Sequence, residues 1–119
     1  MNDSLSQWLA GCALMPGVRG CGVRFPNCVC QSYSFNEDCS RELVDEMLNS
    51  LAETLTRFPH REPAPRWLTW TFSDGKLRLV IRPDGVLLGF ASALDTPTEE
   101  QLNQISEEFL PMEIQTVEQ

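Results

Sequence analysis

Residues Arg66 to Ala93 read RWLTWTFSDGKLRLVIRPDGVLLGFASA, and this stretch decides the fold. Asp74-Gly75 is a hairpin signal, because a two-residue type I′ turn needs positive φ at both central positions. Counting outward from that tip places apolar residues opposite one another on one face: Phe72 with Leu77, Trp70 with Leu79, and Leu68 with Ile81. The other face pairs Thr71 with Arg78, Thr69 with Val80, and Trp67 with Arg82. A slip by one residue would mix the two faces, so the alternation is well specified.

A third strand is predicted after the turn Pro83-Asp84-Gly85. It covers Val86 to Ala93 and carries apolar or small residues on both faces. Strands that are covered on both sides have this composition. The stretch is therefore expected to form an antiparallel meander whose last strand lies inside the sheet.

The first part of the chain predicts a helix followed by a hairpin. The helix is expected to begin at Ser4, with Gln7 completing a capping box, and to end at Pro16-Gly17. Its apolar stripe has helical spacing: Leu5, Trp8, Leu9 and Cys12. The strands Val18 to Phe25 and Cys28 to Ser34 follow, with Pro26-Asn27 as the predicted tip. Gly20 and Gly22 leave little side chain on one face, which invites close approach by a helix.

Two further helices complete the predicted order. One is capped by Ser40 or Asp38 and runs to about Phe58, where Pro59 ends it. Its apolar positions cover an arc of about 180°, which indicates either burial against a second subunit or a wider internal core. The other begins with Thr96 as N-cap, Pro97 at the first helical position and Glu99 completing a capping box, and ends at Pro111.

The element order predicts one domain of the α+β class, over residues 1–111, with a tail at 112–119. Seventeen acidic and nine basic residues give a net charge of −8, which argues against general nucleic-acid binding. The chain opens without a secretory signal pattern, and no apolar run reaches the ~20 residues that span a bilayer. Five cysteines cannot all pair internally, so a cytoplasmic protein with free thiols is expected.

No catalytic constellation stands out in the sequence. Cys28-Val29-Cys30 lies on a predicted strand with Cys21 nearby across the hairpin, so a thiol or zinc site is one hypothesis. Structural zinc sites prefer wider cysteine spacings and a fourth ligand, and strand cysteines usually pack as small hydrophobic residues. The single histidine, His60, sits in a proline-rich loop from Pro59 to Pro65 and reads as a solvated residue. We therefore expect no enzyme activity, no metal and no cofactor.

The chain resembles the roadblock family, that is, dynein light chains of the roadblock type and their prokaryotic relatives. The resemblance rests on the element order and on a Pro-Gly-Val-x-Gly passage into the first strand, here Pro16, Gly17, Val18 and Gly20. It implies a five-stranded antiparallel sheet with one long helix on one face and the terminal helices on the other. It also implies a homodimer, or a heterodimer with a paralogue, built from the long helix and the first strand of the meander. Mapped onto this chain, the implied interface residues are Leu43, Met47, Leu51, Leu55, Trp67, Thr69 and Thr71.

Family resemblance further implies a non-enzymatic scaffold that binds or regulates a Ras-like small GTPase. A competing hypothesis comes from size and acidity, which also resemble type III secretion chaperones that bind an extended segment of an effector. Under both the scaffold and the chaperone hypotheses, we expect no nucleic-acid binding and no membrane insertion.

Overall fold

The structure, a computed structural model, describes residues 3–57 and 66–114. The predicted helix end at Phe58, the loop Pro59–Pro65 with His60, and the last residues of the predicted tail lie outside the described residues. The element order is the predicted one: α1 (Asp3–Ala13), β1 (Val18–Arg24), β2 (Cys30–Tyr33), α2 (Arg41–Thr56), β3 (Trp67–Thr71), β4 (Lys76–Ile81), β5 (Leu87–Ser92) and α3 (Glu99–Phe109).

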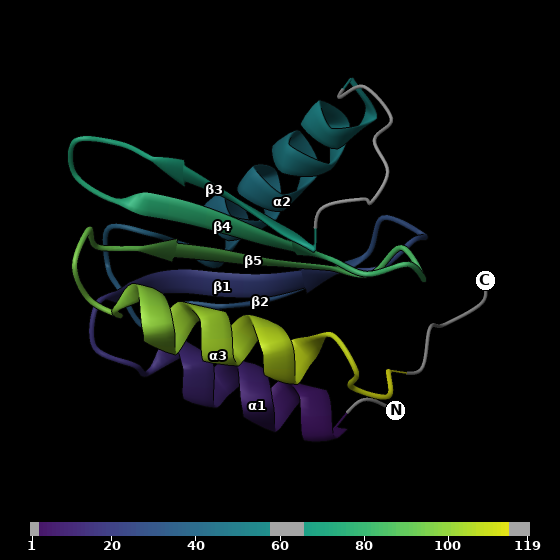
Figure 1. Cartoon of the computed structure of the whole chain (residues 1–119), viewed down its shortest axis with the longest axis horizontal. Helices are drawn as coiled ribbons and strands as arrows, with labels where there is room; N and C mark the ends of the chain where they lie inside the picture. Colours follow the sequence, from purple (N-terminus) through teal and green to yellow (C-terminus); the bar gives the residue numbers. More distant parts are fainter. Residues whose placement is uncertain (1–2, 58–65, 115–119) are drawn as a thin grey trace.

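All five strands form one antiparallel sheet in the order β2-β1-β5-β4-β3. Figure 1 shows α2 on one face of this sheet and α1 with α3 on the other. The α+β class and the layer arrangement are thus confirmed, and β5 lies inside the sheet, as predicted. Among the described helices, none has the length and apolarity needed to cross a membrane.

The sheet separates two hydrophobic layers. The larger lies under α1 and α3 and includes the fully buried Leu9, Val23, Leu88 and Phe109. The smaller lies under α2, where Leu79 is the most deeply buried member. Alternation along each strand divides the apolar side chains between the two layers.

The long helix α2 comes close to the strand backbone because glycines lie beneath it. A Cβ atom built on Gly20 would lie 2.6 Å from a methyl group of Val44. One on Gly89 would lie 2.7 Å from a methyl group of Leu48, and Gly22 meets the same leucine. The predicted role of Gly20 and Gly22 is confirmed, with Gly89 of β5 as a third member.

The β3–β4 hairpin keeps the predicted faces but not the predicted register. Trp70 pairs with Leu77 and Leu68 with Leu79, a shift of two residues. Phe72 donates its amide to the carbonyl of Gly75 at 2.8 Å, so the tip is Ser73-Asp74 and not Asp74-Gly75. Gly75 is not in the positive-φ region; a Cβ there would lie 2.7 Å from the Ser92 carbonyl oxygen. Close packing against β5, and not turn type, accounts for this glycine.

The β1–β2 hairpin is shifted by one residue from the prediction, which moves side chains to the other face. Arg24 pairs with Cys30, and the loop has three residues instead of two. Cys28 occupies its last position with a φ of +73°. The β4–β5 loop has the same design, with Gly85 at φ +88° in the corresponding place. Positive φ at the third loop residue is typical of three-residue hairpins.

Replacing Cys28 with glycine is expected to raise the free energy of unfolding by about 1 kcal/mol. A residue with a Cβ is destabilised by roughly 1–2 kcal/mol in the left-handed region, and glycine avoids this cost. Part of the gain is offset because glycine has the higher conformational entropy in the unfolded state. Gly85→Ala is the matched reverse change and should destabilise the protein. Urea unfolding of both variants checks this prediction. A change of the free energy of unfolding in the same direction and by the same amount in both variants would contradict it.

The predicted helix caps are partly right. Ser40 is the N-cap of α2, accepting from the Leu43 amide. Helix α1 already includes Asp3, so Ser4 lies inside its first turn and is not the N-cap. Helix α3 is capped by Thr98, whose partner in the capping box is Gln101. The predicted pair of Thr96 and Glu99 was therefore wrong by two residues. Glu99 instead reaches Lys76 and Arg78 in β4.

The packed domain extends past the predicted boundary at residue 111. Met112 and Ile114 are half-buried against the larger hydrophobic layer. Arg82 fixes this segment by donating from Nη1 to the carbonyls of Phe109, at 2.9 Å, and Met112, at 2.6 Å. The structured part of the chain thus includes the first residues of the predicted tail.

Candidate interaction surfaces

Among the strands of residues 3–57 and 66–114, β3 pairs only with β4 and so forms an edge of the sheet. Phe72 pairs with Gly75 and Arg66 with Ile81 through backbone hydrogen bonds, so the even-numbered residues of β3 face β4. Alternation of antiparallel hydrogen bonding then directs the backbone groups of Trp67, Thr69 and Thr71 away from the sheet. These outward amides and carbonyls form a template on which a further strand can pair.

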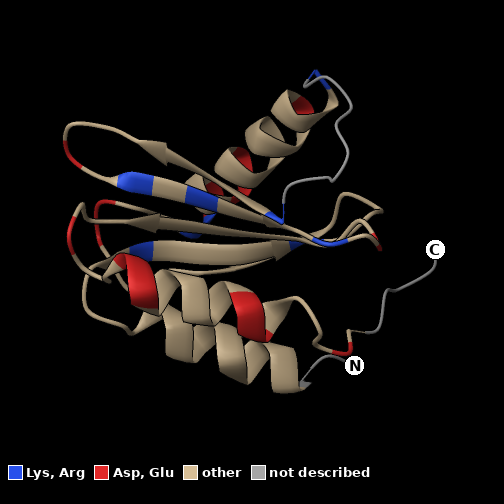
Figure 2. Ribbon diagram, viewed as in Figure 1, with Lys and Arg blue, Asp and Glu red and all other residues tan. Residues whose placement is uncertain are grey.

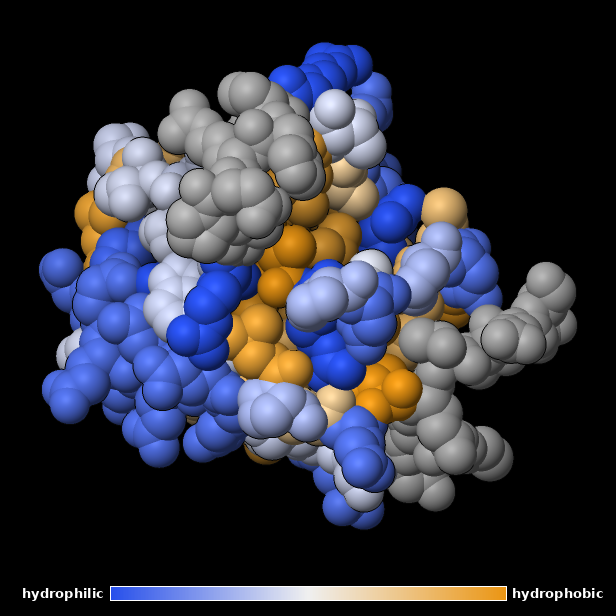
Figure 3. Space-filling model, turned by 45° about the vertical axis from the view of Figure 1, so that its right-hand side comes forward, coloured by the Kyte–Doolittle hydropathy of each residue, from blue (hydrophilic) through white to orange (hydrophobic). Residues whose placement is uncertain are grey.

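An apolar surface adjoins this edge on the α2 side of the sheet. Helix α2 packs over β1, β2 and β5, and leaves the same face of β3 and β4 only partly covered. The side chains left half-buried there form what we call the open flank: Met47, Leu55, Leu68, Trp70, Leu77 and Ile81. Phe72, which follows on β3, is 51% exposed. Figure 3 shows apolar surface in the centre of its view, bordered by hydrophilic residues.

The interface residues implied by the resemblance are distributed over three environments. Leu43 is 49% exposed, Met47 and Leu55 are half-buried in the open flank, and Leu51 is buried against the sheet. Thr69 and Thr71 are exposed on β3.

Trp67 points to the opposite face from the open flank and packs against the larger hydrophobic layer. The predicted pairing of Trp67 with Arg82 was wrong by two residues, because Trp67 pairs with Val80. The guanidinium groups of Arg66 and Arg78 lie 5.4 Å from the Trp67 ring, and Arg82 lies over Phe109.

A buried cation lies beneath α3. Arg78 of β4 is 2% exposed, although its sequence position on the polar face of the hairpin suggested exposure. Its guanidinium contacts Glu99 at 2.5 Å and Asn103 at 2.8 Å, both from α3. Ser106 and Thr69 accept two further hydrogen bonds from it. These hydrogen bonds connect β4 to α3. They also pair the charge of Arg78, and a buried charge must be paired to be tolerated.

We expect the contacts of Glu99 to make a contribution to stability that depends on pH. Partial burial raises its pKa, but the hydrogen bond from Lys76 and the charge of Arg78 outweigh burial and leave the pKa below 4.5. Because the folded pKa lies below the unfolded one, this contribution is present above about pH 4.5 and is lost as the pH falls through the folded pKa. Glu99→Gln should therefore destabilise the protein at pH 7, by less than about 1 kcal/mol since the carboxylate is 54% exposed.

Urea unfolding at pH 7 and pH 3 checks this, and the difference between wild type and variant should shrink in acid. Glu100→Gln is the control, since Glu100 shares the first turn of α3 without the two contacts. A Glu99→Gln deficit that is unchanged at pH 3 contradicts the assignment.

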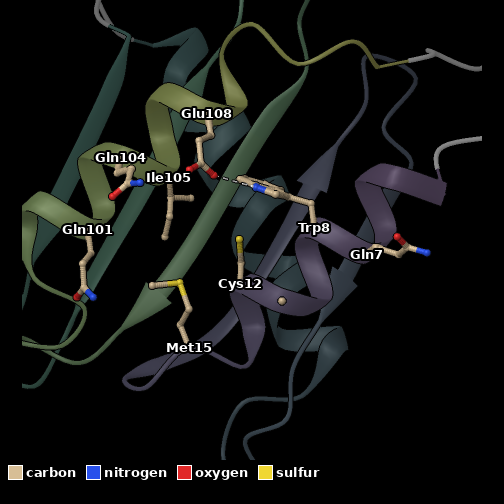
Figure 4. Close-up of a pocket in the computed structure, with 9 residues that line it drawn as sticks. Gln7, Trp8, Cys12, Met15, Gln101, Gln104, Ile105 and Glu108 are labelled. Carbon is tan, nitrogen blue, oxygen red and sulfur yellow. Dashed lines mark hydrogen bonds between the residues drawn. The ribbon is translucent and has the colours of Figure 1, made fainter.

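A groove of about 390 Å³ runs between α1 and α3 on the outer layer of the molecule. Its lining residues come from α1, from Met15 just beyond the end of α1, and from α3: Gln7, Trp8, Gly11, Cys12 and Met15 on one side, and Gln101, Gln104, Ile105 and Glu108 on the other. The indole Nε1 of Trp8 donates to Glu108 at 3.2 Å and bridges the two helices at one end (Figure 4). Cys12, Met15 and Ile105 form an apolar floor beside this bridge.

Gly11 is the unusual residue of the groove. It is exposed in the interior of α1, and a Cβ atom built on it would meet nothing within 4 Å. Glycine inside a helix costs roughly 1 kcal/mol relative to alanine. Packing within the described part of this chain gives no reason for that cost, in contrast to the glycines under α2.

Cys21, Cys28 and Cys30 do not share one face of the β1–β2 hairpin, as the hypothesis of a thiol or zinc site requires. Cys21 points into the larger hydrophobic layer, whereas Cys30 pairs with Arg24 and lies on the other face of β2 near Asp45. Burial raises the pKa of Cys12 to about 12 and raises that of Cys21 as well, so both thiols stay protonated at neutral pH. The described residues contain no group of three or more His, Cys, Asp or Glu that could hold a metal ion.

No protein-family model matches the chain, and no curated protein matches it significantly.

The resemblance pointed to β3 and to two residues of the open flank, Met47 and Leu55, but not to the groove. The groove joins helices from opposite ends of the chain, so no local pattern could bring them together. Gly11 within an otherwise helical stripe was the one available signal.

Proposed function

We propose that this protein is a non-enzymatic scaffold that dimerises, with itself or with a paralogue, through β3 and α2. The observation that carries the proposal is the free edge of β3 beside the open flank. In the proposed dimer, β3 pairs with β3 of the second chain, and the two open flanks cover each other. The roadblock-like element order supports the same arrangement.

The β3 edge and the open flank are both better suited to contact with a second chain than to exposure to solvent. Trp67, Thr69 and Thr71 supply a row of outward backbone groups, which gain hydrogen bonds from a partner strand. Trp70 and Phe72 add apolar area next to that row, and tryptophan is enriched among residues that dominate interface energies. Pairing two identical edges antiparallel is compatible with a two-fold axis, the commonest symmetry of homodimers.

Sedimentation equilibrium at micromolar concentration tests the dimer. The expected result is a mass of twice 13.5 kDa. A monomer at this concentration, in the absence of a paralogue, contradicts the homodimer. Co-expression with candidate paralogues then separates a heterodimer from a protein that does not associate.

As its partner we propose a Ras-like small GTPase, on the strength of the family resemblance. Binding assays with candidate GTPases loaded with GDP or with a non-hydrolysable GTP analogue test this step. Nucleotide-dependent binding supports it. Selective co-purification of an unfolded effector segment, without GTPase binding, would favour the type III chaperone hypothesis instead.

A further inference from the structure

The outer layer formed by α1 and α3 is acidic. Neither helix contains lysine or arginine, while α3 contributes four glutamates and α1 begins with Asp3. Figure 2 shows acidic bands on α3, whereas the turns of α1 beside it are tan. An occupant of the groove between them therefore needs basic groups to match its surroundings.

We propose that this groove is a docking site for a basic amphipathic helix of a partner protein. Apolar side chains of that helix enter beside Met15 and Ile105. Its lysine or arginine side chains meet the Glu108 carboxylate, where the Trp8 ring offers a face for cation–π contact. Its backbone approaches α1 at Gly11, where the missing side chain leaves room.

The form of the groove favours a helix over a small molecule. Along α1 it runs from Gln7 to Cys12, about 8 Å or one and a half turns, and it continues to Met15 beyond the end of the helix while staying open to solvent. An amphipathic helix fits such a surface with side chains spaced at i, i+3, i+4 and i+7. The amides of Gln7 and Gln104 give the rim polar groups that stay solvated or bond to the occupant, while that of Gln101 completes the capping box of α3.

Gly11 is the second, independent observation. Gly11 weakens α1 and faces open space, so its missing side chain leaves room for a backbone from outside the described chain to come close. The docking helix accounts for it, since small residues let two helix backbones come together.

The test uses a fluorescein-labelled Leu/Lys amphipathic peptide of about 14 residues, roughly four helical turns. Fluorescence polarisation measures its affinity for the intact protein at physiological salt. Wild type should bind it, and a Leu/Glu peptide of equal length should not bind. Gly11→Leu fills the groove and should weaken binding about tenfold or more.

Two matched variants separate docking in the groove from general attraction to an acidic protein. Glu108→Gln removes a charge that lines the groove and should weaken binding several-fold. Glu107→Gln removes the neighbouring charge, which does not line the groove, and should leave the affinity unchanged. Gly11→Ala should raise the melting temperature, which shows that changes at this position do not unfold α1.

Equal affinity of wild type and Gly11→Leu overturns the proposal, as does equal weakening by the two glutamate variants. Failure of the Leu/Lys peptide to bind at about 1 mM overturns it too. Peptide binding in the groove is independent of dimerisation, because the groove lies on the face of the sheet opposite the open flank.

Discussion

Arg78→Ala is expected to lower the free energy of unfolding by about 3 kcal/mol. The substitution leaves a cavity beneath α3 and removes the hydrogen bonds that join β4 to Asn103 and Glu99. Breaking a buried ion pair by truncating one partner costs about 3–5 kcal/mol, and the exposure of Glu99 places this case at the low end.

Urea unfolding followed by circular dichroism measures the loss. Arg78→Met retains most of the volume and should cost less than alanine, because apolar replacements of buried ion pairs are often tolerated. Arg57→Ala serves as a surface control, since its ion pair with Glu53 is exposed and should contribute little. A loss of under about 1 kcal/mol for Arg78→Ala would show that the network is not a main support of α3.

Thr69→Pro is expected to abolish the proposed dimer while leaving the monomer folded. Proline lacks the outward amide of the central β3 residue, and it is tolerated on edge strands because that amide does not face β4. The hydroxyl of Thr69 also accepts a hydrogen bond from Arg78, which proline removes. The apparent dissociation constant should rise by about 100-fold, or 2.7 kcal/mol.

Thr69→Val is the matched control for this experiment. Valine loses the same hydroxyl but keeps the amide, so it should remain dimeric. Sedimentation equilibrium on the three proteins gives the answer. Dimerisation of Thr69→Pro with wild-type affinity would exclude pairing through the β3 edge, whatever role the open flank has.

The order of elements and the two faces of each meander strand were predictable from the sequence. Alternation with a period of two fixes which side chains share a face, and a register shift of two residues preserves that assignment. This is why Leu68 and Trp70 were placed correctly on one face although their partners on β4 were not.

Registers were not predictable because they depend on loop conformations set by distant contacts. Gly75 looked like a turn residue, but its small size is needed against the carbonyl of Ser92. Cys28 adopts a positive φ that sequence preference would assign to glycine or asparagine. The α3 cap was ambiguous between Thr96 and Thr98, since each is followed three residues later by a capping-box partner.

The candidate surfaces were predictable to different extents. The edge position of β3 follows from the strand order of the whole sheet, which the local sequence did not predict. Burial of Arg78 was not foreseen, because it depends on α3 lying across β4. The same long-range packing creates the groove between α1 and α3.

The pairing of β1 with β5 has a consequence for how the chain acquires its fold during synthesis. Each hairpin can close locally, but β1 receives its second neighbour only when Cys21 meets Phe90, near the end of the chain. Closing so large a loop is slow, and domains are completed in the order in which the ribosome releases them. Until β5 has emerged, the nascent chain carries an unpaired β1 edge and an α2 without Gly89 beneath it, and unpaired strand edges of this kind are prone to aggregation.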